Sequence, residues 1–270
     1  MPALPWIRRI QAIVIENTVI PNLSPAPPPT TPTVATVTWI DAIAQRHTAA
    51  AGPALLQEHL YEARPIRMSK PHKRSTAYQG HSFISQTRQQ LWTESRLEAF
   101  ALMWIDMSFN VESIATQPMR INFSDGTRHT PDIFALHSDA TQVLYDVKPK
   151  AKLTEDTLTQ FRKTREVCAD IGWGYKVFHE LAPQNHANML WLWNFRRTDL
   201  IPSQEVEARV LELLDEPRTI SSVAVESGLS IPDANTAIFN MLWRRILRTD
   251  LKTRIGYDSL IERTTHGQHN

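Results

Sequence analysis

The chain has 270 residues, of which 42% are hydrophobic and 21% charged, and its formal net charge is +1. This composition excludes wholesale disorder and a fibrous or repeat architecture, and so small a net charge means that contact with nucleic acid must come from local basic clusters or from partners. A lone cysteine, Cys168, excludes an internal disulfide. No apolar stretch approaches the ~20 residues of a membrane span, and no secretion signal is present, so a cytoplasmic protein without a membrane partner is expected.

Residues 1–60 are expected to form an N-terminal extension. The segment Ile10–Ile20 has the composition of a short strand, and six prolines within residues 21–33 predict a linker. Apolar spacing between Trp39 and Leu60 predicts a weak helix that breaks near Gly52. The basic segment Arg64–Arg74 follows, either as a solvated loop or as a strip that touches phosphates.

Residues 61–198 are predicted to form one α/β unit, a restriction-endonuclease-like mixed sheet flanked by helices. Apolar residues at helical spacing predict a helix over residues 93–107 and a second over 155–171, which ends at Gly172. Strands are predicted at residues 120–123, 133–136, 143–147 and 175–178. Helix, hairpin, helix and strand in this order indicate a single central sheet.

Residues 199–262 are predicted to form a winged-helix domain, followed by a disordered tail over 263–270. Helices are expected over 203–214, 219–226 and 232–245, and Gly228 lies in the tight turn between the last two. Residues 246–255 would form a two-stranded wing around Thr249-Asp250. The basic residues of the third helix and wing are expected to contact DNA phosphates, a solvated helix face being the alternative. They are Arg244, Arg245, Arg248, Lys252 and Arg254.

Two short motifs in the α/β unit carry charges suited to phosphodiester hydrolysis. Asp132, after Pro131, begins one strand of the predicted hairpin, and Asp146 and Lys148 share a face of the other. Two carboxylates on adjacent strands suit Mg²⁺, which Mn²⁺ can replace, and the lysine can hold the attacking water or the scissile phosphate. Glu98, on the preceding helix, is the candidate for a further acid. A turn and a solvated strand face are the alternative reading, but two charges on a central strand are costly unless they are paired or bound to metal.

These motifs occur in an order that resembles the TnsA-like endonuclease subunits of heteromeric transposases, within the PD-(D/E)xK nucleases. The resemblance covers about residues 78–197, and the motifs that carry it are Glu94-Ser95-Arg96-Leu97-Glu98, Gln117-Pro118, His129-Thr130-Pro131-Asp132 and Asp146-Val147-Lys148-Pro149. It implies a catalytic set of Glu98, Asp132, Asp146 and Lys148, and metal ligation by Glu98, Asp132, Asp146 and Val147. Some family members carry glutamine at the position of Asp146.

The resemblance also implies a biological context. The protein would cleave the 5′ strands of double-stranded DNA at transposon ends, beside a DDE-type transposase that cuts the 3′ strands and an AAA+ ATPase regulator. Two other functions are compatible with the residues. One is a stand-alone restriction-type or junction-resolving nuclease, and the other is a catalytically idle adaptor that binds DNA through its winged helix.

Overall fold

The computed structural model describes residues 34–67 and 79–264. The predictions for the strand at Ile10–Ile20, for the proline-rich linker and for all but the first two residues of the C-terminal tail lie outside this range. The contacts divide the chain into two compact units, and the boundary falls between Glu180 and Leu181. The sequence had placed that boundary at residues 198 and 199.

A mixed sheet in the order β10-β9-β8-β5 lies at the centre of the first unit. Its strands are β5 (Val111–Thr116), β8 (Ile133–His137), β9 (Gln142–Val147) and β10 (Gly174–Phe178). β9 runs antiparallel to β8 and parallel to β10. The predicted mixed α/β fold is therefore confirmed, with its hairpin and following strand in place.

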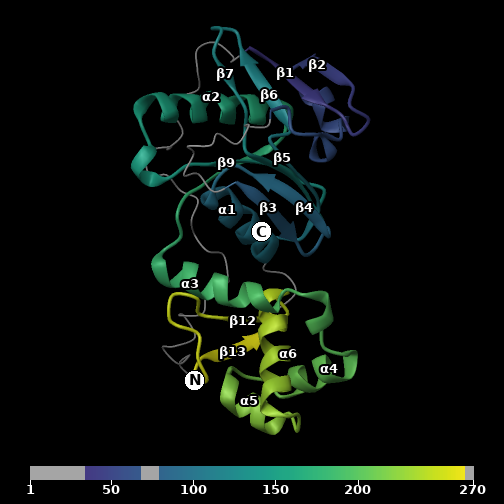
Figure 1. Cartoon of the computed structure of the whole chain (residues 1–270), viewed down its shortest axis with the longest axis vertical. Helices are drawn as coiled ribbons and strands as arrows, with labels where there is room; N and C mark the ends of the chain where they lie inside the picture. The colour runs from purple at the N-terminus through teal and green to yellow at the C-terminus, as the bar shows by residue number, and fades with distance from the viewer. Residues whose placement is uncertain (1–33, 68–78, 265–270) are drawn as a thin grey trace, which may run out of the picture. The chain divides into compact units, whose positions relative to one another are not determined.

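Helices α1 (Arg96–Ser108) and α2 (Glu155–Ile171) cover opposite faces of this sheet (Figure 1). Trp104 of α1 packs against Tyr145 of β9, whereas the preceding residue, Leu144, belongs to the buried core that also contains Val167 of α2. Adjacent residues of a strand point to opposite faces, so Asp146 shares the α2 face with Leu144. The bounds of α2 follow from local signals, since Thr154 caps its first turn and Gly172 ends it with a φ of 99°.

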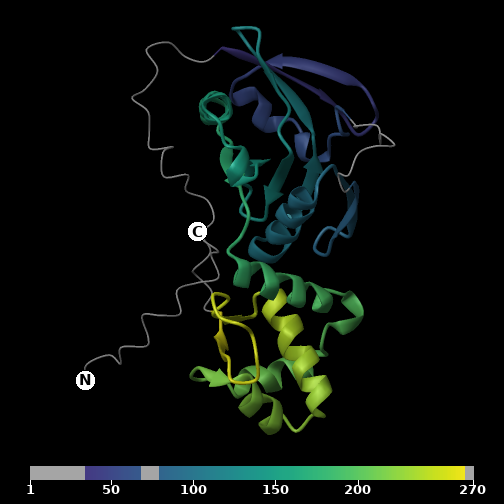
Figure 2. The ribbon, with the colours of Figure 1, turned by 60° about the vertical axis from the view of Figure 1, so that its left-hand side comes forward.

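A second sheet, in the order β2-β1-β6-β7, packs one face into the same core. Its strands are β1 (Ala35–Ile40), β2 (Arg46–Ala50), β6 (Met119–Phe123) and β7 (Arg128–His129). Val37, Trp39 and Ile121 contribute its buried face. In Figure 2, α2 is seen nearly end-on, flanking the strands of the unit.

Three expectations for this unit are wrong. The segment from Trp39 to Leu60 contains the end of β1, a turn, β2 and the 3₁₀ helix Pro53–Gln57 instead of an α-helix, and residues 35–60 belong to the folded unit rather than to an extension. The unit also has more than one sheet. The chain turns from β5 to β6 at Gln117, whose φ of 48° lies in the left-handed region, so the two strands enter different sheets.

A hairpin of β3 (Gly80–Ile84) and β4 (Gln89–Thr93) leads into α1. The buried carboxylate of Asp106, near the end of α1, accepts hydrogen bonds from the backbone N–H groups of Ser85 and Gln86 in the hairpin turn. This contact fixes the hairpin against the helix that carries Glu98. Short 3₁₀ helices complete the chain, namely Pro53–Gln57, Leu60–Glu62, Lys150–Lys152, Trp193–Phe195 and Thr198–Leu200.

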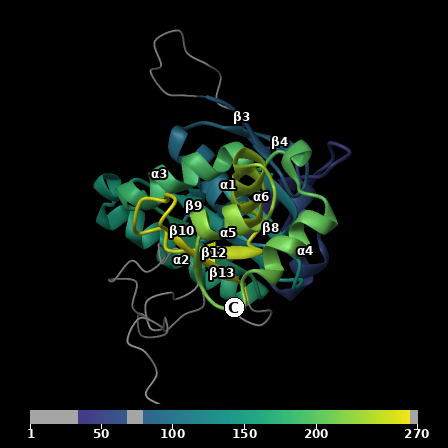
Figure 3. The same ribbon diagram turned by 90° about the horizontal axis from the view of Figure 1, so that it is seen from below.

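Among the described residues, the second unit contains four α-helices, labelled in Figure 3, and a three-stranded sheet in the order β11-β13-β12. The elements are α3 (Pro183–Leu192), α4 (Gln204–Glu212), β11 (Arg218–Thr219), α5 (Ile220–Glu226), α6 (Ile231–Trp243), β12 (Leu247–Thr249) and β13 (Leu260–Arg263). The contact of Trp191 in α3 with Phe239 in α6, at 4.2 Å between ring centroids, explains why α3 groups with this unit.

The predicted wing is wrong in its second strand. β12 pairs with β13 at residues 260–263, and residues 250–259 form a long connection between them. The side chain of Asn188 in α3 holds this connection, donating to the carbonyl oxygens of Leu251 and Thr253 and accepting from the N–H of Ile255. A packing contact of this kind has no signature in the local sequence. Within the described residues, no helix is both long and apolar enough to cross a membrane.

Candidate active site

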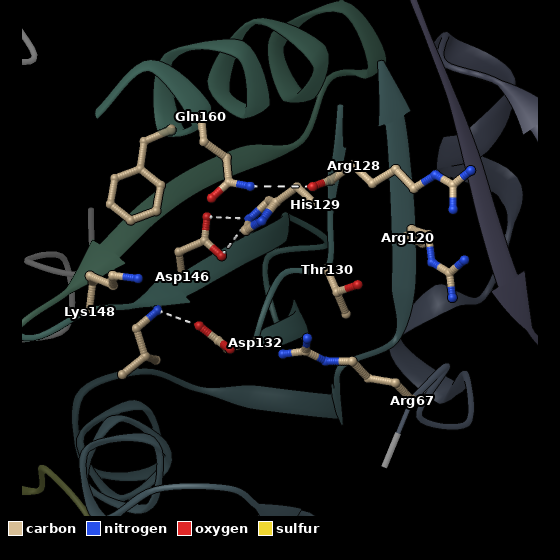
Figure 4. A pocket seen from close by; sticks show the side chains of 11 residues that line it. Arg67, Arg120, Arg128, His129, Thr130, Asp132, Asp146, Lys148 and Gln160 are labelled. Carbon is tan, nitrogen blue, oxygen red and sulfur yellow. Dashed lines mark hydrogen bonds and ion pairs between the residues drawn. The ribbon is translucent and has the colours of Figure 1, made fainter. Parts of the chain in front are cut away.

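Asp132 and Asp146 lie opposite each other at one end of the β8–β9 hairpin. The antiparallel register pairs Ile133 with Tyr145, and its next step places Asp132 across from Asp146. The backbone N–H of Val147 donates to Oδ2 of Asp132 at 2.7 Å and fixes that carboxylate. Lys148 lies two residues beyond Asp146 and so projects from the same side of β9 (Figure 4).

These residues line a pocket of about 440 Å³. Its other lining residues come from the second sheet, from the segment before β3 and from the start of α2. The full set is Arg67, Arg120, Arg128, His129, Thr130, Asp132, Asp146, Val147, Lys148, Gln160 and Phe161. Three of the four predicted catalytic residues therefore meet in one pocket, together with Val147.

Asp146 is held by two side chains that the sequence did not connect to it as partners. Nε2 of His129 lies 2.9 Å from both carboxylate oxygens, and the hydroxyl of Tyr175 donates to Oδ2 at 2.6 Å. The carboxylate is 2% exposed, so these are its main contacts. Burial, followed by the negative charge of Asp146, raises the pKa of Tyr175 well above its ordinary value, which keeps the phenol protonated as a donor.

Glu98, the fourth predicted residue, does not line the pocket. Its Oε2 accepts from the N–H of Glu94 at 2.7 Å and its Oε1 from the hydroxyl of Ser95 at 2.9 Å, while Ser95 accepts from the N–H of Glu98. This reciprocal arrangement resembles a capping box at the first turn of α1. Burial raises the pKa of Glu98, and the neighbouring negative charge of Glu94 adds to that effect.

The acids still act on one another electrostatically. The pKa of Asp132 is raised well above its ordinary value, first by withdrawal from solvent and then by the negative charges of Asp146 and Glu98. Within residues 34–67 and 79–264, however, no three side chains of His, Cys, Asp or Glu gather closely enough to hold a metal ion. The expected donors, carboxylate oxygens and the backbone carbonyl oxygen of Val147, fit a hard divalent cation.

The arginines of the pocket were only partly anticipated. Arg67 belongs to the basic segment for which contact with phosphates was one interpretation, but Arg120 and Arg128 were missed. Arg120 alternates with the buried residues Met119 and Ile121, so the period of β6 places it on the outward face. Arg128 carries no comparable signal, because β7 has only two residues and pairs with β6 across a turn.

The basic residues predicted to bind DNA in the second unit do not form one free cluster. Arg244 pairs with Glu207 at 2.8 Å, and Arg248 pairs with Glu262 at 2.5 Å. Arg245 adopts a left-handed backbone conformation with a φ of 59°. Lys252 and Arg254 are exposed on the connection between β12 and β13.

A mixed α/β unit with this acidic, arginine-lined pocket is consistent with a nuclease-like protein. Residues 108–180 match the family model described as TnsA-like endonuclease N terminal. The resemblance inferred from the sequence motifs is confirmed for this stretch, which contains Asp132, Asp146 and Lys148 but neither Glu98 nor the second unit. No curated protein matches the chain.

Proposed function

We propose that this protein is a Mg²⁺-dependent DNA endonuclease of the TnsA type. The observation that carries the proposal is the placement of Asp132 opposite Asp146, with Lys148 beside them in a pocket bordered by arginines. Two neighbouring carboxylates repel each other, and a cation bound between them would offset that repulsion. The raised pKa of Asp132 is the expected signature of such a site in its metal-free form.

Asp132, Asp146 and the backbone of Val147 would hold the metal, and Glu98 would join them after leaving its cap at the start of α1. Bound there, a divalent cation supplies Lewis acidity and lowers the pKa of a coordinated water. Lys148 orients the attacking water or neutralises the scissile phosphate. Water then adds across one phosphodiester P–O bond, and the departing oxygen takes a proton.

The resemblance supports a finer proposal about context. The protein would cut the 5′ strands at transposon ends, together with a DDE-type transposase and an AAA+ ATPase regulator. The second unit would act as a winged-helix domain that contacts DNA, with α6 as its third helix and the β12–β13 connection as its wing. Because Arg244 and Arg248 have acidic partners, Lys252 and Arg254 are the better candidates for that contact.

A catalytically idle adaptor is the rival function, and one observation favours it. Asp146 and Glu98 already have hydrogen-bonding partners within the protein, and no three ligands are gathered among the described residues. In that case the acids would be structural, and the DNA contact would reside in the second unit alone. Replacing Lys148 would then leave function unchanged.

A nicking assay on supercoiled plasmid DNA tests the two functions. The nuclease proposal predicts nicking in Mn²⁺ and none in EDTA, and it predicts that Lys148→Ala lowers the rate by at least about a hundredfold, the scale expected for loss of one charge-stabilising group. Lys152→Ala is the matched control, because Lys152 is exposed and does not line the pocket. Nicking that persists in EDTA, or that tolerates Lys148→Ala, contradicts the proposal.

A further inference from the structure

We propose that Arg120 and Arg128 form a binding site for the DNA backbone phosphates that flank the scissile phosphate. The first unit would then grip the DNA itself, instead of depending on the second unit for every phosphate contact. The inference rests on the proposed function, since it assigns DNA as the ligand of a pocket proposed to cleave it.

The register of the second sheet places the two arginines side by side. β6 and β7 are antiparallel, with Arg128 opposite Asn122, and Arg120 lies two residues from Asn122 on the same strand face. The arginines are therefore diagonal neighbours on adjacent strands, a separation of about 7–8 Å at which long side chains interact. Figure 4 shows both guanidinium groups projecting in the same direction, on the side of the pocket away from Lys148.

Neither arginine is neutralised within residues 34–67 and 79–264, where no ion pair joins Arg120 or Arg128 to an acid. Nearby cations differ in this respect, because Lys163 pairs with Asp125 at 2.6 Å and Arg67 lies 3.7 Å from Glu94. Like charges on neighbouring strands destabilise a sheet. An anion that accepts from both guanidinium forks would reverse that effect, and phosphate oxygens match the fork geometry.

The sheet surface next to the arginines suits a polyanion. Its outward strand positions carry the exposed Thr36 on β1 and the half-buried Asn122 on β6, whose amide donates to the hydroxyls of Thr36 and of the buried Thr38. Thr48, on β2, lies opposite Thr38 on the same side of the sheet. Hydroxyl and amide groups continue the polar surface, and none of these positions is acidic. A DNA strand that leaves the pocket along Arg120, Asn122 and Thr36 therefore meets no acidic side chain at these strand positions.

The test measures how salt weakens binding of a fluorescein-labelled DNA duplex in EDTA, by fluorescence anisotropy. The double variant Arg120→Gln/Arg128→Gln is compared with wild type. Loss of two phosphate contacts should make the slope of log affinity against log salt concentration less steep by about 1.8, which is about 0.9 for each contact. The affinity advantage of wild type should then shrink about tenfold when the salt concentration rises fourfold.

Two further variants make the result specific. Arg162→Gln is the control. Arg162 is exposed on α2 and lies two residues, or about 200° of helix rotation, beyond Gln160 of the pocket. Among the residues that the structure describes, its side-chain hydrogen bonds stay within α2. This variant should keep the wild-type slope. The double variant Arg120→Lys/Arg128→Lys keeps both charges and should recover most of the slope. An unchanged slope in the glutamine variant, or an equal loss in Arg162→Gln, overturns the proposal.

Mn²⁺ titration of the same glutamine variant separates this inference from the proposed function. The two arginines contribute no oxygen ligand, so Mn²⁺ binding should match wild type. A flattened salt slope with wild-type Mn²⁺ binding supports both proposals. A flattened slope in a protein that binds no Mn²⁺ even as wild type supports the phosphate site and contradicts the nuclease.

Discussion

Replacing the pocket acid Asp132 by asparagine should stabilise the metal-free protein at alkaline pH. The pKa of Asp132 is raised, first by withdrawal from solvent and then by Asp146 and Glu98, so the native state holds this proton more tightly than the unfolded chain does. The stability that this tighter proton binding gives the native state is complete below the ordinary pKa of 3.8 and is lost as pH rises through the raised pKa. Above that value the native protein carries an unfavourable charge, which asparagine removes.

The magnitude follows from two opposing effects. The N–H of Val147 donates to Asp132 at 2.7 Å, and asparagine can still accept that bond through its amide oxygen. Exchanging a charged acceptor for a neutral one costs about 1 kcal/mol. Removing a carboxylate that is withdrawn from water and forms no ion pair among the described residues gains roughly 3 kcal/mol. The free energy of unfolding of Asp132→Asn should therefore exceed that of wild type by about 2 kcal/mol above the raised pKa.

Urea denaturation in EDTA across a pH series measures this difference. The advantage of Asp132→Asn should grow with pH and disappear in acid. Asp125→Asn is a control of opposite sign, because the hydrogen bond from Lys163 holds the pKa of Asp125 below its ordinary value. The exposed ion pair of Asp125 with Lys163 should stabilise the native state above the ordinary pKa of Asp125, and this stabilisation should be lost as pH falls. If Asp132→Asn is less stable than wild type throughout the series, withdrawal from solvent and the charges of Asp146 and Glu98 do not destabilise the ionised Asp132, and the reasoning is refuted.

Three further substitutions test individual contacts. Tyr175→Phe removes a 2.6 Å hydrogen bond to Asp146 and should lower the free energy of unfolding by about 2 kcal/mol in metal-free urea denaturation, whereas a loss below about 0.5 kcal/mol would show that His129 suffices. Asp106→Ala removes the acceptor for the turn between β3 and β4 and should lower the free energy of unfolding by about 3 kcal/mol. Hydrogen exchange should accelerate first in that turn, and uniform acceleration across the unit would contradict this. Asn188→Ala frees the β12–β13 connection, so it should raise hydrogen exchange there and weaken duplex binding, and unchanged exchange would refute its role as a clamp.

The parts of the fold that follow from local sequence were predictable. The bounds of α2 depend on a cap at Thr154 and a left-handed glycine at Gly172, both visible as residue types. The placement of Asp132 beside Asp146 was also predictable, because a short hairpin joins their strands. By contrast, β1 was missed: its first residues were assigned to an N-terminal extension, and the expected helix began at Trp39, near its end. β1 pairs with β6, more than 70 residues further along the chain, and local sequence does not reveal such a partner.

The same distinction explains what was missed at the candidate site. Tyr175 reaches Asp146 because β10 pairs in parallel with β9 after a long helix, and His129 reaches it from β7 of the other sheet. Neither contact follows from spacing along the chain. Glu98 shows the converse case. The sequence motifs assigned it as a catalytic acid and metal ligand, whereas the structure places its carboxylate in a capping interaction with Ser95 at the start of α1.

Calorimetric titration of Mn²⁺ into the wild-type chain and into Asp132→Asn tests the central claim most directly, because it needs neither a DNA target nor a partner subunit. The account predicts that wild type binds Mn²⁺ and that Asp132→Asn, folded and at least as stable, does not. Asp125→Asn should bind as wild type does. If wild type and Asp132→Asn give the same heats, the paired acids do not form a metal site, and the adaptor function becomes the better explanation of the fold.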